Sequence, residues 1–246
     1  MERHEYDTIR EVEDRHWWYQ GLWELTLSWL QRAMPPAPGC VVLDAGCGTG
    51  GLLATLGPRY PLAVGVDLSE DALRHSRGRG LAATARASVE CLPFAGATFD
   101  AIVSNDVLYH RTAHEAPALA EFRRVLKPRG VLLMNLPALE SMRGTHDVVV
   151  HTRRRFTRAD LLQLLPTHGF EPIRVTYRNS LLFPIAWLVR KTRRPVPGEM
   201  PAKSDVEMPG PAVNAILHAA LRLENSLLGA VDFPIGLSLY CLARKA

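Results

Sequence analysis

The 246-residue chain contains little cysteine and no apolar run long enough to cross a membrane. Four cysteines occur, at Cys40, Cys47, Cys91 and Cys241. Their spacing matches neither metal ligands nor a disulfide framework, so we expect reduced thiols, no metal site and a cytoplasmic location. The apolar stretch at residues 181–189 is too short for a transmembrane span, and the charged, aromatic N-terminus is unlike a secretory signal.

Charge of one sign is also scarce. With 29 Lys and Arg against 25 Asp and Glu, the formal net charge is only +4. Nucleic-acid-binding proteins usually gather basic residues in a stripe or an added module, and neither is visible, so we do not expect nucleic acid as a partner. The composition, 47% hydrophobic and 22% charged, is that of an ordinary globular protein. We expect a small-molecule substrate and a monomer or homodimer.

Short apolar strands and amphipathic helices alternate along most of the chain. This alternation predicts an α/β fold with a mainly parallel sheet and helices on both faces. Residues 1–34 are expected to form an N-terminal helical cap, ended by a proline-rich turn. Residues 35–178 and 234–246 are expected to form the core. Within it, the helix that begins near residue 116 is expected to run until Pro128 and Gly130 stop it.

An insertion at residues 179–233 interrupts the core. It contains the apolar stretch 181–189, a basic run, a proline-rich loop and a predicted helix over 213–228. A patch as apolar as this stretch must be covered by something in a monomer. We expect the insertion to form a helical lid over an apolar substrate pocket, with a dimer interface as the alternative. Contact with a membrane surface is a third possibility.

The segment VLDAGCGTG at residues 42–50 carries the sharpest chemical signal. A buried strand ends in a turn whose glycines permit positive φ and the close approach of a ligand. A helix follows at once, so its free N–H groups face that ligand. Asp44 precedes the turn and is able to hold an ammonium group. In the next strand, VGVDLS, Asp67 is placed to accept hydrogen bonds from a ribose diol.

Four segments together resemble the class I S-adenosylmethionine-dependent methyltransferase family: VLDAGCGTG, VGVDLS, LPFAGATFDAIVSNDVLYH and FRRVLKPRGVLLMNLP. The glycines read GxGxG rather than the GxGxxG of dehydrogenases. The resemblance implies a Rossmann-like seven-stranded sheet, mostly parallel with an antiparallel last strand, and S-adenosyl-L-methionine lying across its C-terminal edge. The flanks, including DRHWWYQ, resemble a type 11-like bacterial subgroup with an N-terminal HWW motif, which often serves natural-product or glycan biosynthesis.

The resemblance also implies a set of cofactor-binding positions. Ser88 stands where family members often carry an acidic residue, and the N–H of Val89 is expected to bond the adenine ring. Trp18 and Tyr19, beside His16 and Trp17, are expected to close over the cofactor, with plain helix packing as the alternative. The full set is Trp18, Tyr19, Asp44, Gly46, Cys47, Gly48, Gly50, Asp67, Leu68, Ser88, Val89, Glu90, Asn105 and Val107.

Candidate catalytic residues follow the fourth and fifth strands. His110 ends the motif SNDVLYH and has the intrinsic pKa of a general base, although a surface histidine is the alternative. His146, Asp147 and His151 follow the fifth strand, where a His–Asp pair is able to activate a hydroxyl group. The basic run at residues 153–158 is expected to form a solvated face, or else to bind an anionic group of the substrate.

The predicted reaction is transfer of a methyl group from S-adenosyl-L-methionine to an oxygen atom, with nitrogen second, of a small hydrophobic natural-product or glycan-type acceptor. The motif Asn/Asp-Pro-Pro-aromatic is absent after the fourth strand, which argues against methylation of base amines or amides. Two alternatives stay open: a cofactor-binding protein that catalyses a non-methylating cyclisation, and an RNA methyltransferase.

Overall fold

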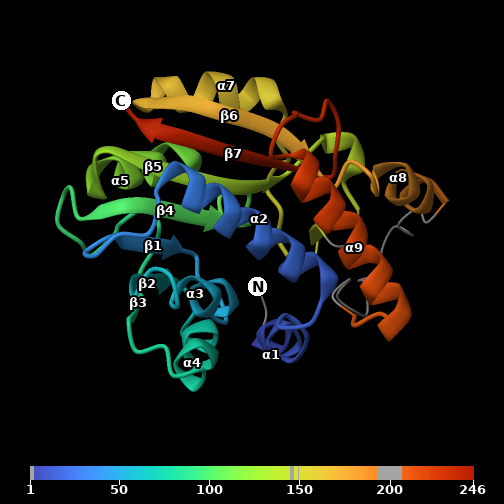
Figure 1. Ribbon diagram of the computed structural model, residues 1–246, viewed down its shortest axis with the longest axis horizontal. Helices are drawn as coiled ribbons and strands as arrows, with labels where there is room; N and C mark the ends of the chain where they lie inside the picture. The colour runs from blue at the N-terminus through green and yellow to red at the C-terminus, as the bar shows by residue number, and fades with distance from the viewer. Residues whose placement is uncertain (1–2, 145–146, 149, 193–206) are drawn as a thin grey trace.

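The computed structural model describes residues 3–144, 147, 148, 150–192 and 207–246. Its centre is a seven-stranded sheet in the order β3-β2-β1-β4-β5-β7-β6 (Figure 1). The strands are β1 (Val41–Ala45), β2 (Leu62–Asp67), β3 (Thr84–Arg86), β4 (Phe99–Asn105), β5 (Leu126–Pro137), β6 (Phe170–Arg178) and β7 (Ser238–Lys245). Strand β7 is antiparallel to both its neighbours, and the other pairings are parallel. The predicted fold class is confirmed.

Helices cover both faces of this sheet because its central strands are apolar on both sides. Leu43 and Ile102 pack on one face against α5 (Glu115–Val125) and α7 (Arg158–Thr167). Val42 and Val103 pack on the other face against α2 (Trp17–Ala33) and α3 (Gly51–Leu56). The helix α4 (Glu70–Gly78) joins β2 to β3, and a short 3₁₀ turn, η1 (Glu140–Met142), follows β5.

The N-terminal segment is two helices rather than one. After α1 (Arg3–Val12) the chain breaks at His16, whose extended backbone and ring nitrogen cap α2 by accepting the Trp18 N–H at 3.3 Å. The apolar face of α2 then lies on the sheet, with Leu25 and Trp29 inside the core. A further difference concerns α5, which ends at Val125 instead of continuing to residue 130, because the chain there already pairs with β4 as strand β5.

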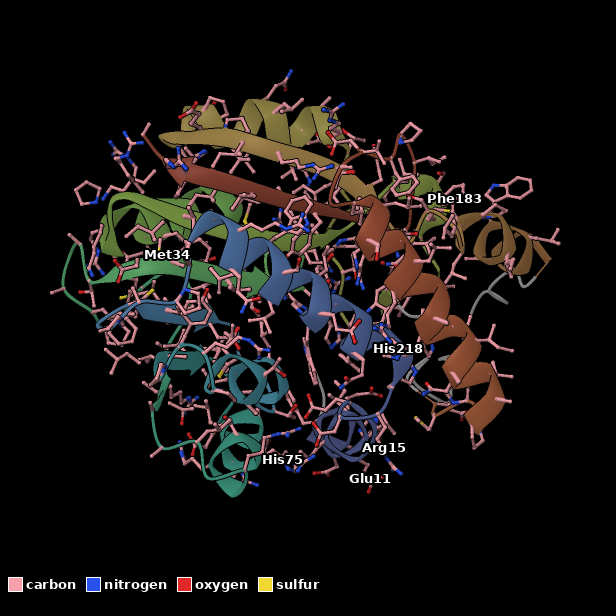
Figure 2. The ribbon with its side chains drawn as sticks, in the orientation of Figure 1. Glu11, Arg15, Met34, His75, Phe183 and His218 are labelled. Carbon is pink, nitrogen blue, oxygen red and sulfur yellow. The ribbon has the colours of Figure 1, made fainter. Side chains whose placement is uncertain are left out.

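The insertion contributes α8 (Phe183–Thr192) and α9 (Pro211–Leu227). Figure 1 shows α9 beside α2, and Figure 2 shows His218 of α9 on the side toward α2. His218 pairs with Glu24 at 3.2 Å, and the Asn214 side chain accepts the Trp17 N–H at 3.0 Å. Helix α9 is therefore fixed to the outer side of α2. Within the described part of the chain, no helix combines the length and apolar character that a bilayer crossing requires.

Candidate functional site

A cavity of about 470 Å³ opens at the carboxyl ends of β1 and β4. Its floor is the glycine loop after β1 together with the end of β4, and its roof is formed by α1 and the start of α2. The far end is closed by four residues that follow β5, by Ala186 of α8 and by Leu237 and Ser238 at the start of β7. The four residues are Asp147, Val150, Thr152 and Arg155. The carboxyl edge of a parallel sheet is where α/β proteins usually bind ligands.

The glycines of the loop differ in the space around them. Gly46 has φ +92°, and a Cβ there would lie 2.2 Å from Cγ2 of Val107, so the predicted Val107 supports the loop from beneath. Gly48 has φ +53°, lines the cavity, and a Cβ there would meet no atom within 4 Å. A side chain at Gly48 would therefore occupy space that is free for a ligand. Cys47 also lines the cavity, whereas Gly50 packs against α4.

The two acidic residues predicted to hold the cofactor have different surroundings. Asp44 lines the cavity, is 2% exposed, and its Oδ2 atom has no hydrogen-bond partner among the described residues. Burial, reinforced by the nearby Asp67 carboxylate, raises the pKa of Asp44 to about 8. Asp67 accepts hydrogen bonds from the N–H groups of Gly48 at 2.9 Å and Ser69 at 2.8 Å, so it fixes the loop.

Aromatic residues form the roof of the cavity, as the HWW motif suggested. His16, Trp17, Trp18 and Tyr19 all line it, together with Trp23 further along α2. Burial raises the pKa of the Tyr19 hydroxyl, and the carboxylates of Glu13 and Asp106 add to this effect. Trp18 and Tyr19 therefore line the cavity, and their closure over a bound cofactor stays a prediction.

Helix α1 completes the roof, and polar contacts join it and the residues after it to α4 and its C-terminal end. Arg79 bonds Asp14 at 2.8 Å, and His75 bonds Asp7 at 2.8 Å. Tyr6, Ile9 and Glu13 face the cavity from this helix and its end. The sequence pattern gave no sign of these residues, because the pattern of α1 does not show which wall it covers.

The end of β4 supplies Asp106, a residue that the sequence analysis passed over between Asn105 and Val107. Asp106 lines the cavity with φ +57°, a conformation that costs energy in a residue other than glycine and that collects at functional sites. Its Oδ1 accepts a hydrogen bond from Nδ2 of Asn135 at 2.8 Å. Burial raises the pKa of Asp106 to about 6, against the lowering effect of Asn135 and the Arg178 guanidinium. Its position directly after a strand, inside the family motif, was the available signal.

Two residues predicted beside it also line the cavity. Asn105 donates through Nδ2 to the Thr26 hydroxyl at 3.1 Å. His110 stacks on Tyr109 with ring centroids 4.3 Å apart, and its Nδ1 lies 2.7 Å from the Val150 carbonyl. Burial lowers the pKa of His110 to about 4, so the imidazole is neutral near pH 7.

The predicted His–Asp pair after β5 falls partly outside the described residues, which include Asp147 but not His146. Asp147 forms a buried bidentate ion pair with Arg155, both N–O distances being 3.0 Å, and accepts the Gly144 N–H at 2.7 Å. Although burial opposes it, the Arg155 guanidinium lowers the pKa of Asp147. His151 is exposed and His146 lies outside the described residues. Arg155 is 8% exposed, so this part of the basic run is not the solvated face that we expected.

The segments predicted to contact adenine lie beside the cavity rather than in its described lining. Leu68 is 49% exposed at the end of β2. The Ser88 hydroxyl accepts the Glu90 N–H at 3.1 Å, and Glu90 accepts a hydrogen bond from the His114 N–H at 2.5 Å. Val89 is 7% exposed and belongs to the core. Within the described part of the chain, no three His, Cys, Asp or Glu side chains form a potential metal site.

Comparison with known proteins gives matches over the same region. The family described as "Methyltransferase domain" matches residues 43–134. A malonyl-[acyl-carrier protein] O-methyltransferase of Herminiimonas arsenicoxydans is 34% identical over 58% of this chain and 57% of its own length. A ubiquinone/menaquinone biosynthesis C-methyltransferase of Syntrophotalea carbinolica is 35% identical over 59% of this chain and 58% of its own length. The chain thus spans less than three fifths of each of these relatives.

Solved structures share the fold at lower identity. A phosphoethanolamine N-methyltransferase of Haemonchus contortus, in complex with S-adenosyl-L-methionine, is 19% identical, with a TM-score of 0.60 over 91% of this chain and 52% of its own. This similarity concerns the fold alone. By their names, the two relatives and this structure methylate oxygen, carbon and nitrogen, so the matches do not specify an acceptor atom.

Proposed function

We propose that the chain, whose residues 43–134 match a methyltransferase domain, is a class I S-adenosylmethionine-dependent methyltransferase. It binds this cofactor in the cavity and transfers its methyl group to an oxygen atom of a small acceptor. The match of residues 43–134 supports the family predicted from the sequence, and with it the predicted cofactor. The type of acceptor, and the residues that bind and deprotonate it, are what we propose.

The residues around the glycine loop fit S-adenosyl-L-methionine. The open space at Gly48 leaves room for the cofactor's chain against the backbone, and the unpartnered Oδ2 of Asp44 needs a cationic or hydrogen-bond-donating neighbour. Asp67 keeps the loop in shape from beside the described lining of the cavity, and each of its oxygens keeps a lone pair that a ribose hydroxyl would use. When bound, the cofactor supplies a methyl group on a positively charged sulfur, which is already a good leaving group. The protein must mainly position the acceptor and exclude water.

Asp106 is the residue that we propose as the general base. Its Oδ1 is held by Asn135, whereas no described residue donates to Oδ2, which is therefore free to take the proton of an acceptor hydroxyl. A base works best when its pKa lies near the working pH, and burial brings the pKa of Asp106 to about 6. His110 is the second candidate: it is neutral and lines the same wall, but its ring is held by the Val150 carbonyl.

The far end of the cavity favours a neutral, largely apolar acceptor. Trp17, Val150 and Leu237 line it, and Ala186 brings the insertion to its edge as part of the proposed lid. The cation at this end, Arg155, is neutralised by Asp147 and so offers little to an anionic substrate. A hydrophobic natural-product or glycan-type acceptor with a free hydroxyl group suits this lining. Cytoplasmic location and a monomeric or dimeric state remain predictions.

The single observation that carries this proposal is the placement of Gly48 and Asp106 in the walls of one cavity. The test is incubation with S-adenosyl-L-methionine labelled in its methyl group, together with a panel of phenols, hydroxy acids, sugars and amines. We expect label in an ether or ester methyl group of at least one acceptor. Label only in amines would move the reaction to nitrogen, and release of no S-adenosylhomocysteine with any acceptor would contradict methyl transfer.

A further inference from the structure

The carboxylate of Glu13 reaches the glycine loop from the N-terminal segment. Glu13 is 3% exposed and lines the cavity just after the end of α1. Its Oε1 atom accepts two hydrogen bonds, from the Thr49 hydroxyl at 2.6 Å and from Nη2 of Arg79 at 2.5 Å. These bonds fix the carboxylate beside the start of α3, directly beyond the glycine turn.

The second oxygen of the same carboxylate is not used by the fold. No described residue donates to Oε2, which lies 2.6 Å from the point where a Cβ on Gly51 would stand. Burial raises the pKa of Glu13, and the bonds from Thr49 and Arg79 oppose this effect. Glu13 and Gly51 both line the cavity, so Oε2 lies at the cavity wall, where a donor on a ligand would stabilise it.

Asp44 repeats this situation from the floor of the cavity. It comes from β1 rather than from the N-terminal segment, and its buried Oδ2 also has no partner among the described residues. The guanidinium of Arg79 is shared between Glu13 and Asp14, so it does not also pair with Asp44 in the described structure. This end of the cavity therefore suits a ligand group that is cationic and carries N–H donors.

S-adenosyl-L-methionine has two cationic groups, and only one of them donates hydrogen bonds. The sulfonium has no N–H, whereas the α-ammonium has three. Hydrogen bonds between an ionised donor and a carboxylate are shorter and stronger than neutral ones. We propose that Oε2 of Glu13, together with Oδ2 of Asp44, binds the α-ammonium of the cofactor. This inference rests on the proposed function, and it makes the N-terminal segment a direct part of the cofactor site.

The test uses three ligands that differ in the groups concerned. S-adenosyl-L-methionine carries both cations, S-adenosylhomocysteine keeps only the ammonium, and 5′-methylthioadenosine has neither. Titration calorimetry on the full chain would compare the wild type with Glu13→Gln. Asp14→Asn serves as a matched control, because it also removes a carboxylate from Arg79 but does not line the cavity.

We expect Glu13→Gln to weaken binding of S-adenosyl-L-methionine and S-adenosylhomocysteine by about 10- to 100-fold, the scale of a hydrogen bond to a charged group. Binding of 5′-methylthioadenosine should stay within about twofold of the wild type, and Asp14→Asn should leave all three affinities nearly unchanged. A parallel loss for all three ligands would show that Glu13 only holds α1 in place and would overturn the inference. An unchanged affinity, or a loss confined to the sulfonium ligand, would overturn it too. A wild type that binds none of the three would instead contradict the proposed function.

Discussion

Asn135 holds Asp106 from two sides: its Nδ2 donates to the Asp106 carboxylate at 2.8 Å, and its backbone carbonyl accepts the Asp106 N–H at 2.9 Å. Asn135 is completely buried in β5. These bonds therefore attach Asp106, at the wall of the cavity, to a rigid strand of the sheet. They stabilise a residue whose φ of +57° would otherwise be unfavourable. The carboxylate proposed as the base is thereby fixed in one orientation.

Asp106→Asn should abolish most methyl transfer while leaving the fold intact. Asparagine is close in shape and tolerates the left-handed conformation better than most residues. We expect turnover to fall by about 10²- to 10⁴-fold, the usual contribution of a general base, while affinity for the cofactor is unchanged. Turnover would be measured with whichever acceptor the labelling panel identifies, and His110→Asn is the comparison. If His110→Asn loses more turnover than Asp106→Asn, the histidine is the base.

The same assignment predicts the pH dependence of turnover. The groups facing Asp106 are the hydroxyls of Tyr19 and Tyr109 and the guanidinium of Arg178. Burial raises the pKa of both tyrosines, so they stay protonated near neutral pH. The rate should therefore rise with pH and level off above about 6, where the Asp106 carboxyl loses its proton. A profile that is flat between pH 5 and 8, or that keeps its acidic limb in Asp106→Asn, would contradict this role.

The ion pair between Asp147 and Arg155 should be a major contributor to stability. Both side chains are buried, so Asp147→Asn leaves a guanidinium without its counter-charge and should lower the free energy of unfolding by about 3–5 kcal/mol. Arg10→Gln breaks an exposed pair with Asp14 and should cost less than about 1 kcal/mol. Urea denaturation would measure both. Equal losses of unfolding free energy in the two variants would contradict a large contribution from the buried pair.

The pH dependence of this contribution has a defined sign. Because the pKa of Asp147 is lowered in the folded protein, its stabilisation is fully present above the ordinary pKa of an aspartate. It is lost as the pH falls through the lowered value. Asp147→Asn should accordingly flatten the decline of stability in acid, and an unchanged decline would contradict the assignment.

Two helical glycines should respond in opposite ways to alanine. A Cβ at Gly21 of α2 would lie 2.6 Å from Cδ1 of Leu221 in α9, so overpacking should outweigh the gain in helix propensity and destabilise by about 1–3 kcal/mol. Gly78 of α4 is exposed with no atom near its missing Cβ, and Gly78→Ala should stabilise by about 0.4–1 kcal/mol. Thermal denaturation would compare them. Stabilisation by both changes would mean that α9 is not packed closely on α2.

Those parts of the site that depend on local pattern could be predicted from the sequence. The glycine turn, Asp44 and the alternation of strands and helices are local features. The turn needs residues that adopt positive φ, and short apolar segments indicate the buried strands of the sheet. Trp18 and Tyr19 were expected near the cofactor from the resemblance, and they line the cavity.

Other residues were missed because tertiary contacts decide their role. Glu13 belongs to the site only because the chain breaks at His16 and brings α1 against α4. Arg155 looked like part of an exposed basic run, yet it turns inward because Asp147 is placed opposite it. A sequence pattern does not record which partner a charged side chain will meet across a loop.

The most direct test of the account is binding of S-adenosyl-L-methionine at Gly48, measured by titration calorimetry. Gly48→Val would place a side chain in the open space that the cofactor is proposed to occupy. Gly39→Val is the matched control, because Gly39 also has positive φ and open surroundings but does not line the cavity. The account predicts that the wild type and Gly39→Val bind the cofactor with similar affinity and that Gly48→Val does not bind it measurably. Undiminished binding by a folded Gly48→Val variant would contradict the central claim that the cofactor lies against the glycine loop.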